Sequence, residues 1–103
     1  MTERTEILDD DGYPTDAFLQ SIRDWPYTAG FNALLEHAMQ GHIYDKYWSC
    51  EPDENGGKVW HISTGGWSGN ESIIDALEEN SMFWLICWYQ SRRGGHYIFT
   101  CPL

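Results

Sequence analysis

Basic residues are scarce in this chain: six lysines and arginines stand against sixteen aspartates and glutamates, a formal net charge of −10. A surface that binds nucleic acid needs clustered basic side chains to neutralise phosphates, so this composition argues against direct nucleic-acid binding. An acidic surface can keep a protein soluble, or it can complement a basic surface on a protein partner. Charge alone favours the first reading.

Long apolar runs and paired cysteines are also missing. The longest apolar stretch, Met82 to Tyr89, is far shorter than the ~20 residues that span a bilayer. The first residues do not show the basic-then-apolar pattern of a signal peptide. The three cysteines, at positions 50, 87 and 101, include no CxxC pair. We therefore expect a soluble, reduced protein of the cytoplasm that makes no membrane contact.

Recognised metal and catalytic motifs are missing too. The histidines and cysteines match no structural zinc spacing, so we expect neither a metal site nor a cofactor. No G-x-S-x-G elbow, HExxH or paired acidic motif is present. Acid–base chemistry by His61 or His96 with Glu71, or nucleophilic chemistry by a hydroxyl of Ser63, Thr64 or Ser68, stays open. The sequence favours a binding protein over an enzyme.

Aromatic residues, by contrast, are abundant, with six Trp, six Tyr and four Phe among 103 residues. Their burial alone supplies a large hydrophobic driving force, so we expect a folded single domain over residues 1–103. Residues 1–13 are acidic and turn-like, and we expect a flexible or loop segment there. Aromatics this dense exceed the needs of a small core, so some should line a surface or pocket.

Hydrophobic periodicity predicts an α+β domain with the order ααββαββ. Thr15 is the expected N-cap of a first helix that ends at Pro26, and a second helix over Phe31–Met39 is expected to end at Gly41. Strands are predicted at 43–50, 58–63, 82–90 and 96–101, with a third helix ending near Asn80. Glycine-bearing turns at 55–57 and 92–95 predict two hairpins. The three helices would pack on a four-stranded, largely antiparallel sheet.

The most informative segment is the glycine-rich loop Ser63–Glu71 between a predicted strand and a predicted helix. Ser68 and Glu71 fit a capping box, which needs no ligand. The capping box does not explain three glycines with Trp67 between them. Glycine amides can approach an anion closely and an exposed indole can stack on a ring, so the loop is a candidate binding site. The loop lacks a Walker lysine and the GxGxxG pattern.

A second candidate feature is the turn 92–96, where two of the six basic residues stand together. The arginines are either solvated or form a clamp for an anion beside His96. If both glycine turns lie at one edge of the sheet, they would share a pocket for a small polar or anionic ligand, such as a nucleotide-derived signal. The candidate ligand-binding residues are Ser63, Thr64, Gly65, Gly66, Trp67, Ser68, Gly69, Asn70, Arg92, Arg93 and His96.

The alternative function is inhibition of a host nucleic-acid-binding enzyme by protein docking. Asp75, Glu78 and Glu79 on the third predicted helix would then supply the acidic contact surface. A homodimer through an aromatic strand face is a further expectation about partners.

The strings Trp60–Glu71 (WHISTGGWSGNE) and Arg93–Tyr97 (RGGHY) resemble small uncharacterised proteins encoded by phages and prophages. The resemblance covers roughly the second half of the chain. It implies a cytosolic accessory protein of phage origin, a class that includes many inhibitors of host defence, and it assigns no role to individual residues.

Overall fold

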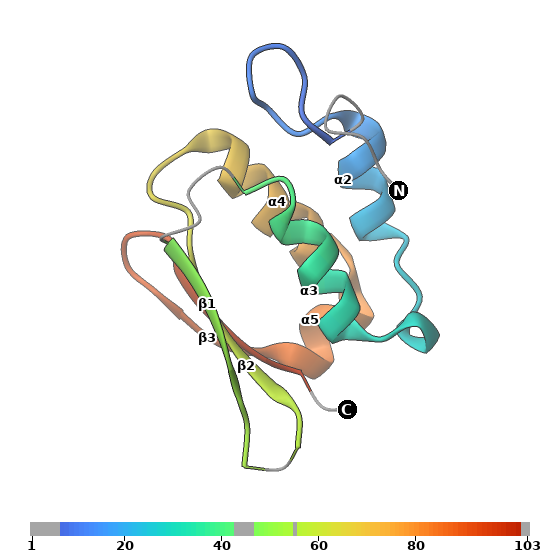
Figure 1. The fold of residues 1–103 in the computed structure, drawn as a ribbon, viewed down its shortest axis with the longest axis vertical. Helices are drawn as coiled ribbons and strands as arrows, with labels where there is room; N and C mark the ends of the chain where they lie inside the picture. The colour runs from blue at the N-terminus through green and yellow to red at the C-terminus, as the bar shows by residue number, and fades with distance from the viewer. Residues whose placement is uncertain (1–6, 43–46, 55, 102–103) are drawn as a thin grey trace.

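Helices and sheet form two layers in the computed structural model, which describes residues 7–42, 47–54 and 56–101 (Figure 1). The predicted α+β class is confirmed, with one more helix than the order ααββαββ contains. The described elements are α2 (Asp16–Arg23), η1 (Tyr27–Ala29), α3 (Phe31–Met39), β1 (Trp48–Pro52), β2 (Lys58–Ser63), α4 (Ser68–Glu79), α5 (Ser81–Cys87), β3 (Trp88–Arg92) and β4 (His96–Cys101).

The N-terminal helices begin as the sequence predicts. Thr15 Oγ1 accepts a hydrogen bond from the Phe18 amide at 3.2 Å, so Thr15 caps α2. The helix ends at Arg23, shortly before Pro26. Helix α3 spans the predicted residues Phe31–Met39, and its apolar face is buried.

Gly41 differs from its predicted role as a helix cap. Gln40 caps α3 in a helical conformation, and Gly41 is not among the glycines with positive φ. A Cβ at Gly41 would lie 2.6 Å from Phe18 Cε2. Glycine is required at position 41 by close packing against Phe18 of α2. It is not required there by a left-handed capping conformation.

The described part of the acidic N-terminal segment, from Ile7 onward, forms a turn. Residues 1–6 lie outside the described residues, but Leu8 and Pro14 form a bridge that closes a turn. Asp9 Oδ1 accepts hydrogen bonds from the amides of Asp11 and Tyr13 at 2.9 and 3.0 Å. The segment from Ile7 onward is thus a closed turn, with Ile7 buried in the core.

Four described strands form an antiparallel sheet in the order β1-β2-β4-β3. The two predicted hairpins are confirmed, and β2 pairs with β4 to join them. Strand β1 runs from Trp48 to Pro52 because it pairs with Lys58–Ile62, so it ends later than the predicted Cys50. Residues 43–46 of that predicted strand, and Asn55 of the turn, lie outside the described residues.

The predicted central strand over Met82–Gln90 is wrong. Its first part is helix α5, and its last part is β3, an edge strand in which all five residues are exposed. Asn80 Oδ1 accepts a hydrogen bond from the Phe83 amide at 3.2 Å and so starts a helix. Phe83 and Cys87, four residues apart, are buried on one side. A short apolar run fits a buried strand and a helix equally well, and the cap decides between them.

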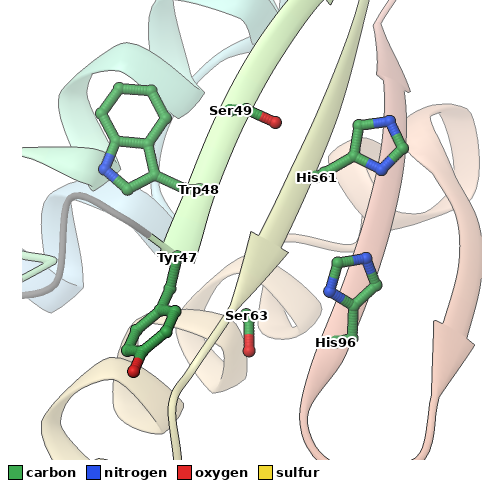
Figure 2. Close-up of a pocket in the computed structure, with 6 residues that line it drawn as sticks. All are labelled: Tyr47, Trp48, Ser49, His61, Ser63 and His96. Atoms are coloured by element: carbon green, nitrogen blue, oxygen red, sulfur yellow. The ribbon is translucent and has the colours of Figure 1, made fainter.

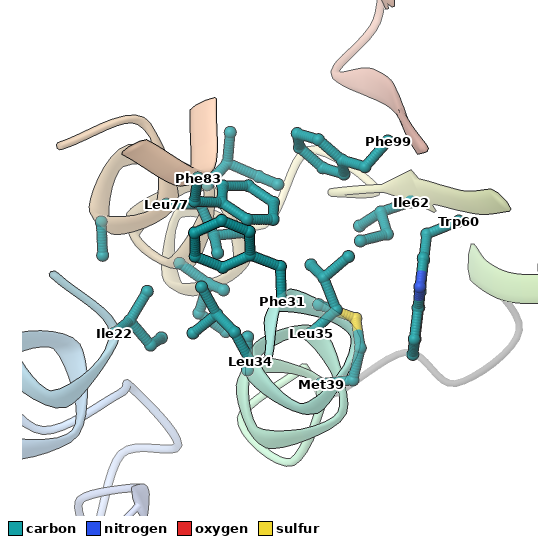
Figure 3. Packing of buried hydrophobic residues seen from close by; sticks show 14 of the residues in the cluster. Ile22, Phe31, Leu34, Leu35, Met39, Trp60, Ile62, Leu77, Phe83 and Phe99 are labelled. Atoms are coloured by element: carbon teal, nitrogen blue, oxygen red, sulfur yellow. The ribbon is translucent and has the colours of Figure 1, made fainter. Parts of the chain in front are cut away.

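The core lies between the two layers. Phe31, Leu34 and Leu35 from α3 meet Phe83 from α5 and Phe99 from β4 (Figure 3). Phe83 contacts Phe31 edge-on with ring centroids 5.4 Å apart, and lies 5.2 Å from Phe99. All the described helices lie on the same side of the sheet (Figure 1). We call the other side, which carries no described helix, the open face.

Asn80 joins three parts of the helical layer and is only 6% exposed. Besides capping α5, its amide donates hydrogen bonds to the carbonyl oxygens of Ile22 and Trp25, both at 3.0 Å. Removing the side chain therefore uncaps a helix and leaves two carbonyls in the helical layer without this donor.

We expect Asn80→Ala to lower the free energy of unfolding by roughly 3 kcal/mol, the sum of a lost cap and two lost hydrogen bonds. Asn80→Ser keeps a capping oxygen and should lose about 1 kcal/mol less. Urea denaturation of both variants measures the difference. A loss below about 1 kcal/mol for Asn80→Ala would contradict this role.

Candidate functional site

The two glycine-bearing segments of interest lie side by side at one end of the sheet. Ser63 and His96 form the last pair of the β2–β4 ladder. Immediately beyond it, the Thr64 amide donates to the Gly95 carbonyl oxygen at 3.0 Å. A Cβ at Gly95 would lie 2.4 Å from Thr64 Oγ1, and Gly95 has φ +77°, so both space and backbone conformation require glycine there.

The glycine-rich loop is held together by its own hydrogen bonds. The Gly66 amide donates to Thr64 Oγ1 at 3.3 Å, and the Gly65 amide donates to Ser63 Oγ at 3.4 Å. Asn70, which is 1% exposed, donates through Nδ2 to the Thr64 carbonyl oxygen at 3.1 Å. These amides serve turn closure in the structure, and their predicted role as donors to a ligand stays a prediction.

Trp67 is half-buried, whereas the sequence predicts an exposed indole. Its ring lies against Tyr13, with centroids 4.6 Å apart. A Cβ at Gly69 would meet Trp67 Nε1 at 2.4 Å, so this glycine makes room for the indole. Trp67 therefore packs the loop against the N-terminal turn.

The predicted capping box at Ser68 and Glu71 is wrong by one residue. Helix α4 begins at Ser68, with Trp67 in extended conformation as the capping residue. The Glu71 amide donates to the Trp67 carbonyl oxygen at 3.0 Å. Ser68 Oγ instead bonds to the Tyr13 hydroxyl at 3.4 Å. The helix therefore starts one residue earlier than the box requires, at Ser68 and not at Gly69, with Trp67 packed against Tyr13 as its capping residue.

The open face of the sheet carries a hollow of ≈ 260 Å³ beside the paired turns. Its lining residues come from three neighbouring strands and the residue before β1: Tyr47, Trp48, Ser49, His61, Ser63 and His96. In Figure 2, Ser49, His61 and His96 point to the same side of the sheet, opposite to the indole of Trp48. Two of the predicted site residues, Ser63 and His96, thus line one hollow with residues that the prediction did not include.

Basic side chains gather at this corner of an acidic protein. The rings of His61 and His96 are 6.1 Å apart. Arg92 pairs with His96 across β3 and β4, and its guanidinium donates to the neutral Gln90 side chain at 3.3 Å. Partial burial, the charge of Arg92 and the neighbouring His61 lower the pKa of His96 below 6.5.

Glu51 places a carboxylate beside one of these basic side chains, His61. Its Oε1 lies 3.0 Å from His61 Nε2, and both side chains are partly exposed. The His61–Glu51 pair holds one imidazole in place on the open face, whereas His96 faces the cation Arg92. The arrangement therefore leaves the His96 side of the hollow as its more positive end.

Arg93 and the acidic residues of α4 lie away from this lining. Arg93 is exposed in the turn after β3. Asp75, Glu78 and Glu79 are exposed on α4, and Glu79 forms an ion pair with Arg23. Burial first, and then Asp75, Glu78 and Glu71, raise the pKa of Tyr97. The acids of the alternative hypothesis therefore form a separate, negatively charged side of the molecule.

Four lining residues are absent from the predicted ligand-binding set: Tyr47, Trp48, Ser49 and His61. Of these, the sequence indicated only His61, as a possible acid–base group. The signal for His61 was the alternation of β2, in which Trp60 and Ile62 are buried while His61 and Ser63 face outward. Pairing with β4 then sets Ser63 opposite His96. Tyr47, Trp48 and Ser49 line the hollow because β1 lies beside β2. The pattern of one strand does not reveal which strand lies next to it.

The remaining histidines have structural partners. His37 Nε2 lies 2.8 Å from Ser21 Oγ, and its ring stacks on Trp25 with centroids 5.1 Å apart. His42 Nε2 lies 2.8 Å from the Ser63 carbonyl oxygen. Among residues 7–42, 47–54 and 56–101, no group of three or more His, Cys, Asp or Glu side chains is arranged to hold a metal ion.

No family model, curated protein or solved structure was found to match this chain. The resemblance to phage-encoded proteins therefore stays a prediction. The described part of the chain contains no helix of the length and apolar character that crossing a membrane requires.

The electrostatics of the hollow can be tested through His96. We expect Arg92→Gln to raise the pKa of His96, because a neighbouring cation that disfavours the imidazolium is removed. The pKa should stay below 6.5, because burial is the larger cause of its shift. An NMR titration of the imidazole protons measures this value.

Arg93→Gln removes the same charge from the adjacent residue and serves as the control. It should shift the His96 pKa less than Arg92→Gln does, because Arg93 is not among the groups that lower it. An unchanged or lower pKa in Arg92→Gln would contradict the geometry described here.

Proposed function

We propose that this chain is a small acidic binding protein that holds a small anionic ligand against the open face of its sheet. The observation that carries the proposal is that His61 and His96 line one hollow, with Arg92 opposite His96 on the neighbouring strand, in a chain with a net charge of −10. No reaction is assigned to the site.

Electrostatics support an anion in this position. Burial and two basic neighbours lower the pKa of His96, so its imidazole gains a proton less readily unless a counter-charge is present. A bound anion supplies that counter-charge and can accept charge-assisted hydrogen bonds from Arg92 and His96. Affinity should therefore increase as the pH falls through the pKa of His96.

The size and lining of the hollow favour a ligand with a small planar part as well as a charged part. A volume of ≈ 260 Å³ lies just below the range of typical small-molecule sites, which begins at ~300 Å³. Tyr47, on the β1 side of the hollow, supplies an aromatic ring, and Ser49 and Ser63 supply hydroxyl groups. A nucleoside monophosphate or a similar nucleotide-derived signal combines these features.

The glycine loop has a positioning role in this proposal. Thr64 and Gly95 hold the ends of β2 and β4 together, which keeps Ser63 and His96 side by side. Trp67 and Asn70 then fix the loop to the N-terminal turn and to Thr64. The ligand would thus contact the sheet face, with the loop forming one end of the site.

The resemblance to phage-encoded accessory proteins gives the proposal a biological setting. In that setting the protein acts in the cytoplasm of the host cell and withholds a nucleotide-derived signal from a defence system. The acidic surface supports this setting, because it keeps the protein off nucleic acids while a local positive corner receives the small anion.

Calorimetric titration with adenosine monophosphate and with inorganic phosphate tests the proposal. We expect His96→Gln and Arg92→Gln each to weaken binding by roughly 10-fold or more, because each removes a charge-assisted hydrogen bond. Binding of the unsubstituted protein should also tighten as the pH falls below 6.5, because the lowered pKa of His96 means that the imidazole gains its proton only there.

Lys58→Gln is the matched control, because it removes one positive charge at the opposite end of β2. Its binding should stay within about 2-fold of the unsubstituted protein, since exposed charges at a distance are screened. Failure of both probes to bind, or equal losses in Lys58→Gln and His96→Gln, would contradict the proposal.

The α4 surface supports a second candidate function, docking on a basic protein surface. Asp75 and Glu78 are exposed, and their charges act together on Tyr97, so this side of the molecule is negatively charged. Such a surface can occupy the nucleic-acid site of a host enzyme.

The docking hypothesis predicts that the protein captures nucleic-acid-binding enzymes from host lysate and that duplex DNA displaces them. The pair Asp75→Asn and Glu78→Gln should reduce capture at least about 10-fold and flatten its salt dependence. The pair Asp10→Asn and Asp11→Asn, which removes two exposed charges from the N-terminal turn, should not. Equal losses in both pairs would contradict a specific role for α4.

A further inference from the structure

Exposed apolar side chains are concentrated in one short part of the chain. Of the eight large hydrophobic side chains that are exposed in the described residues, five lie between positions 82 and 89, and the other three are tyrosines. We call these five residues the α5–β3 patch: Met82, Leu85, Ile86, Trp88 and Tyr89.

The patch is continuous along the chain. Met82, Leu85 and Ile86 have the i, i+3, i+4 spacing that places side chains on one side of a helix. Helix α5 passes directly into β3, and Trp88 stacks on Trp84 of the helix with ring centroids 6.2 Å apart. The outer side of the helix and the first residues of the edge strand therefore form one surface.

The fold does not require these side chains to be apolar. Phe83 and Cys87 on the opposite side of α5 are fully buried and supply its contact with the core. Leu85, by contrast, is 81% exposed. Single exposed apolar residues are ordinary, but a cluster of five in a strongly acidic chain indicates a contact surface.

The absence of charge in the patch favours a second copy as the occupant. Two copies that each carry −10 repel one another, so a contact between them is least opposed where acidic side chains are absent. Residues 81–91 contain no charged side chain at all. In a two-fold contact each residue near the axis faces its own counterpart, so a charged residue there would meet a like charge. The uncharged segment 81–91 avoids this repulsion.

A lipid surface fits less well. Peripheral membrane surfaces surround their apolar residues with lysine and arginine, which contact anionic headgroups. Beside the patch only Arg92 and Arg93 follow in the sequence, whereas Glu78 and Glu79 precede it. The net negative charge of the chain would oppose adsorption to an anionic membrane.

The exposed area is of the size that a dimer contact needs. At ~200 Å² for a fully exposed large side chain, the five residues present roughly 500 Å² of apolar surface per copy. Specific interfaces bury ~800 Å² per partner, so the patch supplies more than half of one side before its polar rim is counted.

We propose that the α5–β3 patch is the interface of a two-fold symmetric homodimer. A bulge between Trp88 and Gln90 interrupts the regular edge of β3, so side-chain packing drives the association and continuous strand pairing does not. Trp88 and Tyr89, at the strand end of the patch, are residue types that commonly anchor interfaces.

Sedimentation velocity over concentrations from about 1 to 500 μM tests the dimer, because association that depends on mass action must weaken on dilution. We expect twice the chain mass at the upper end for the unsubstituted protein. Tyr89→Glu should raise the dimer dissociation constant at least about 100-fold, because it places an acid opposite its own counterpart.

Tyr27→Glu is the matched control, since Tyr27 and Tyr89 are both 64% exposed and only Tyr89 belongs to the patch. Tyr27→Glu should dimerise like the unsubstituted protein. Leu85→Glu provides a second variant within the patch, and circular dichroism confirms that each variant is folded. A monomeric unsubstituted protein, a dimer that survives Tyr89→Glu and Leu85→Glu, or equal losses in Tyr27→Glu would each overturn the proposal.

Discussion

The pairing of β2 with β4 is the interaction on which the rest of this structure depends. It joins two hairpins that are separated in sequence by α4 and α5, through six residue pairs from Lys58 with Cys101 to Ser63 with His96. Such long-range pairing orders a large loop and is stabilised by the apolar face that it creates. Trp60, Ile62 and Phe99 supply that face, which α3 and α5 cover (Figure 3).

The same pairing decides what the other face carries. Side chains alternate along a strand, so burying Trp60 and Ile62 turns His61 and Ser63 outward. In β4, His96 then lies opposite Ser63 at the end of the ladder. All the described helices cover one side of the sheet (Figure 1). Strand alternation and cross-strand pairing therefore place His61, His96 and Arg92 on the other side.

Much of this fold follows from local sequence signals. The glycine turns predict both hairpins, and the cap at Thr15 and the spacing over Phe31–Met39 predict the first two helices. The run Met82–Gln90 was misread because its apolar character fits either helix or strand, and the single signal for a helix was Asn80 as its cap. Local pattern alone does not show that a capping residue before a short apolar run decides between helix and strand.

The candidate site was predictable only in part, for a different reason. Ser63 and His96 were recognised from their glycine-bearing turns, and those turns do lie together. The roles of the loop residues depend on tertiary contacts, since Trp67 packs on Tyr13 and the glycine amides bond within the loop. His61 and Ser49 join the hollow through strand order, which emerges from packing of the whole chain.

The most direct measurement is an amide NMR titration of the protein with adenosine monophosphate, read residue by residue. An anion site on the open face should give its largest shifts at Ser49, His61, Ser63, Arg92 and His96. Shifts confined to Gly65–Trp67 would move the site to the glycine loop and contradict the open-face site. No shift at any residue at millimolar ligand would contradict anion binding itself.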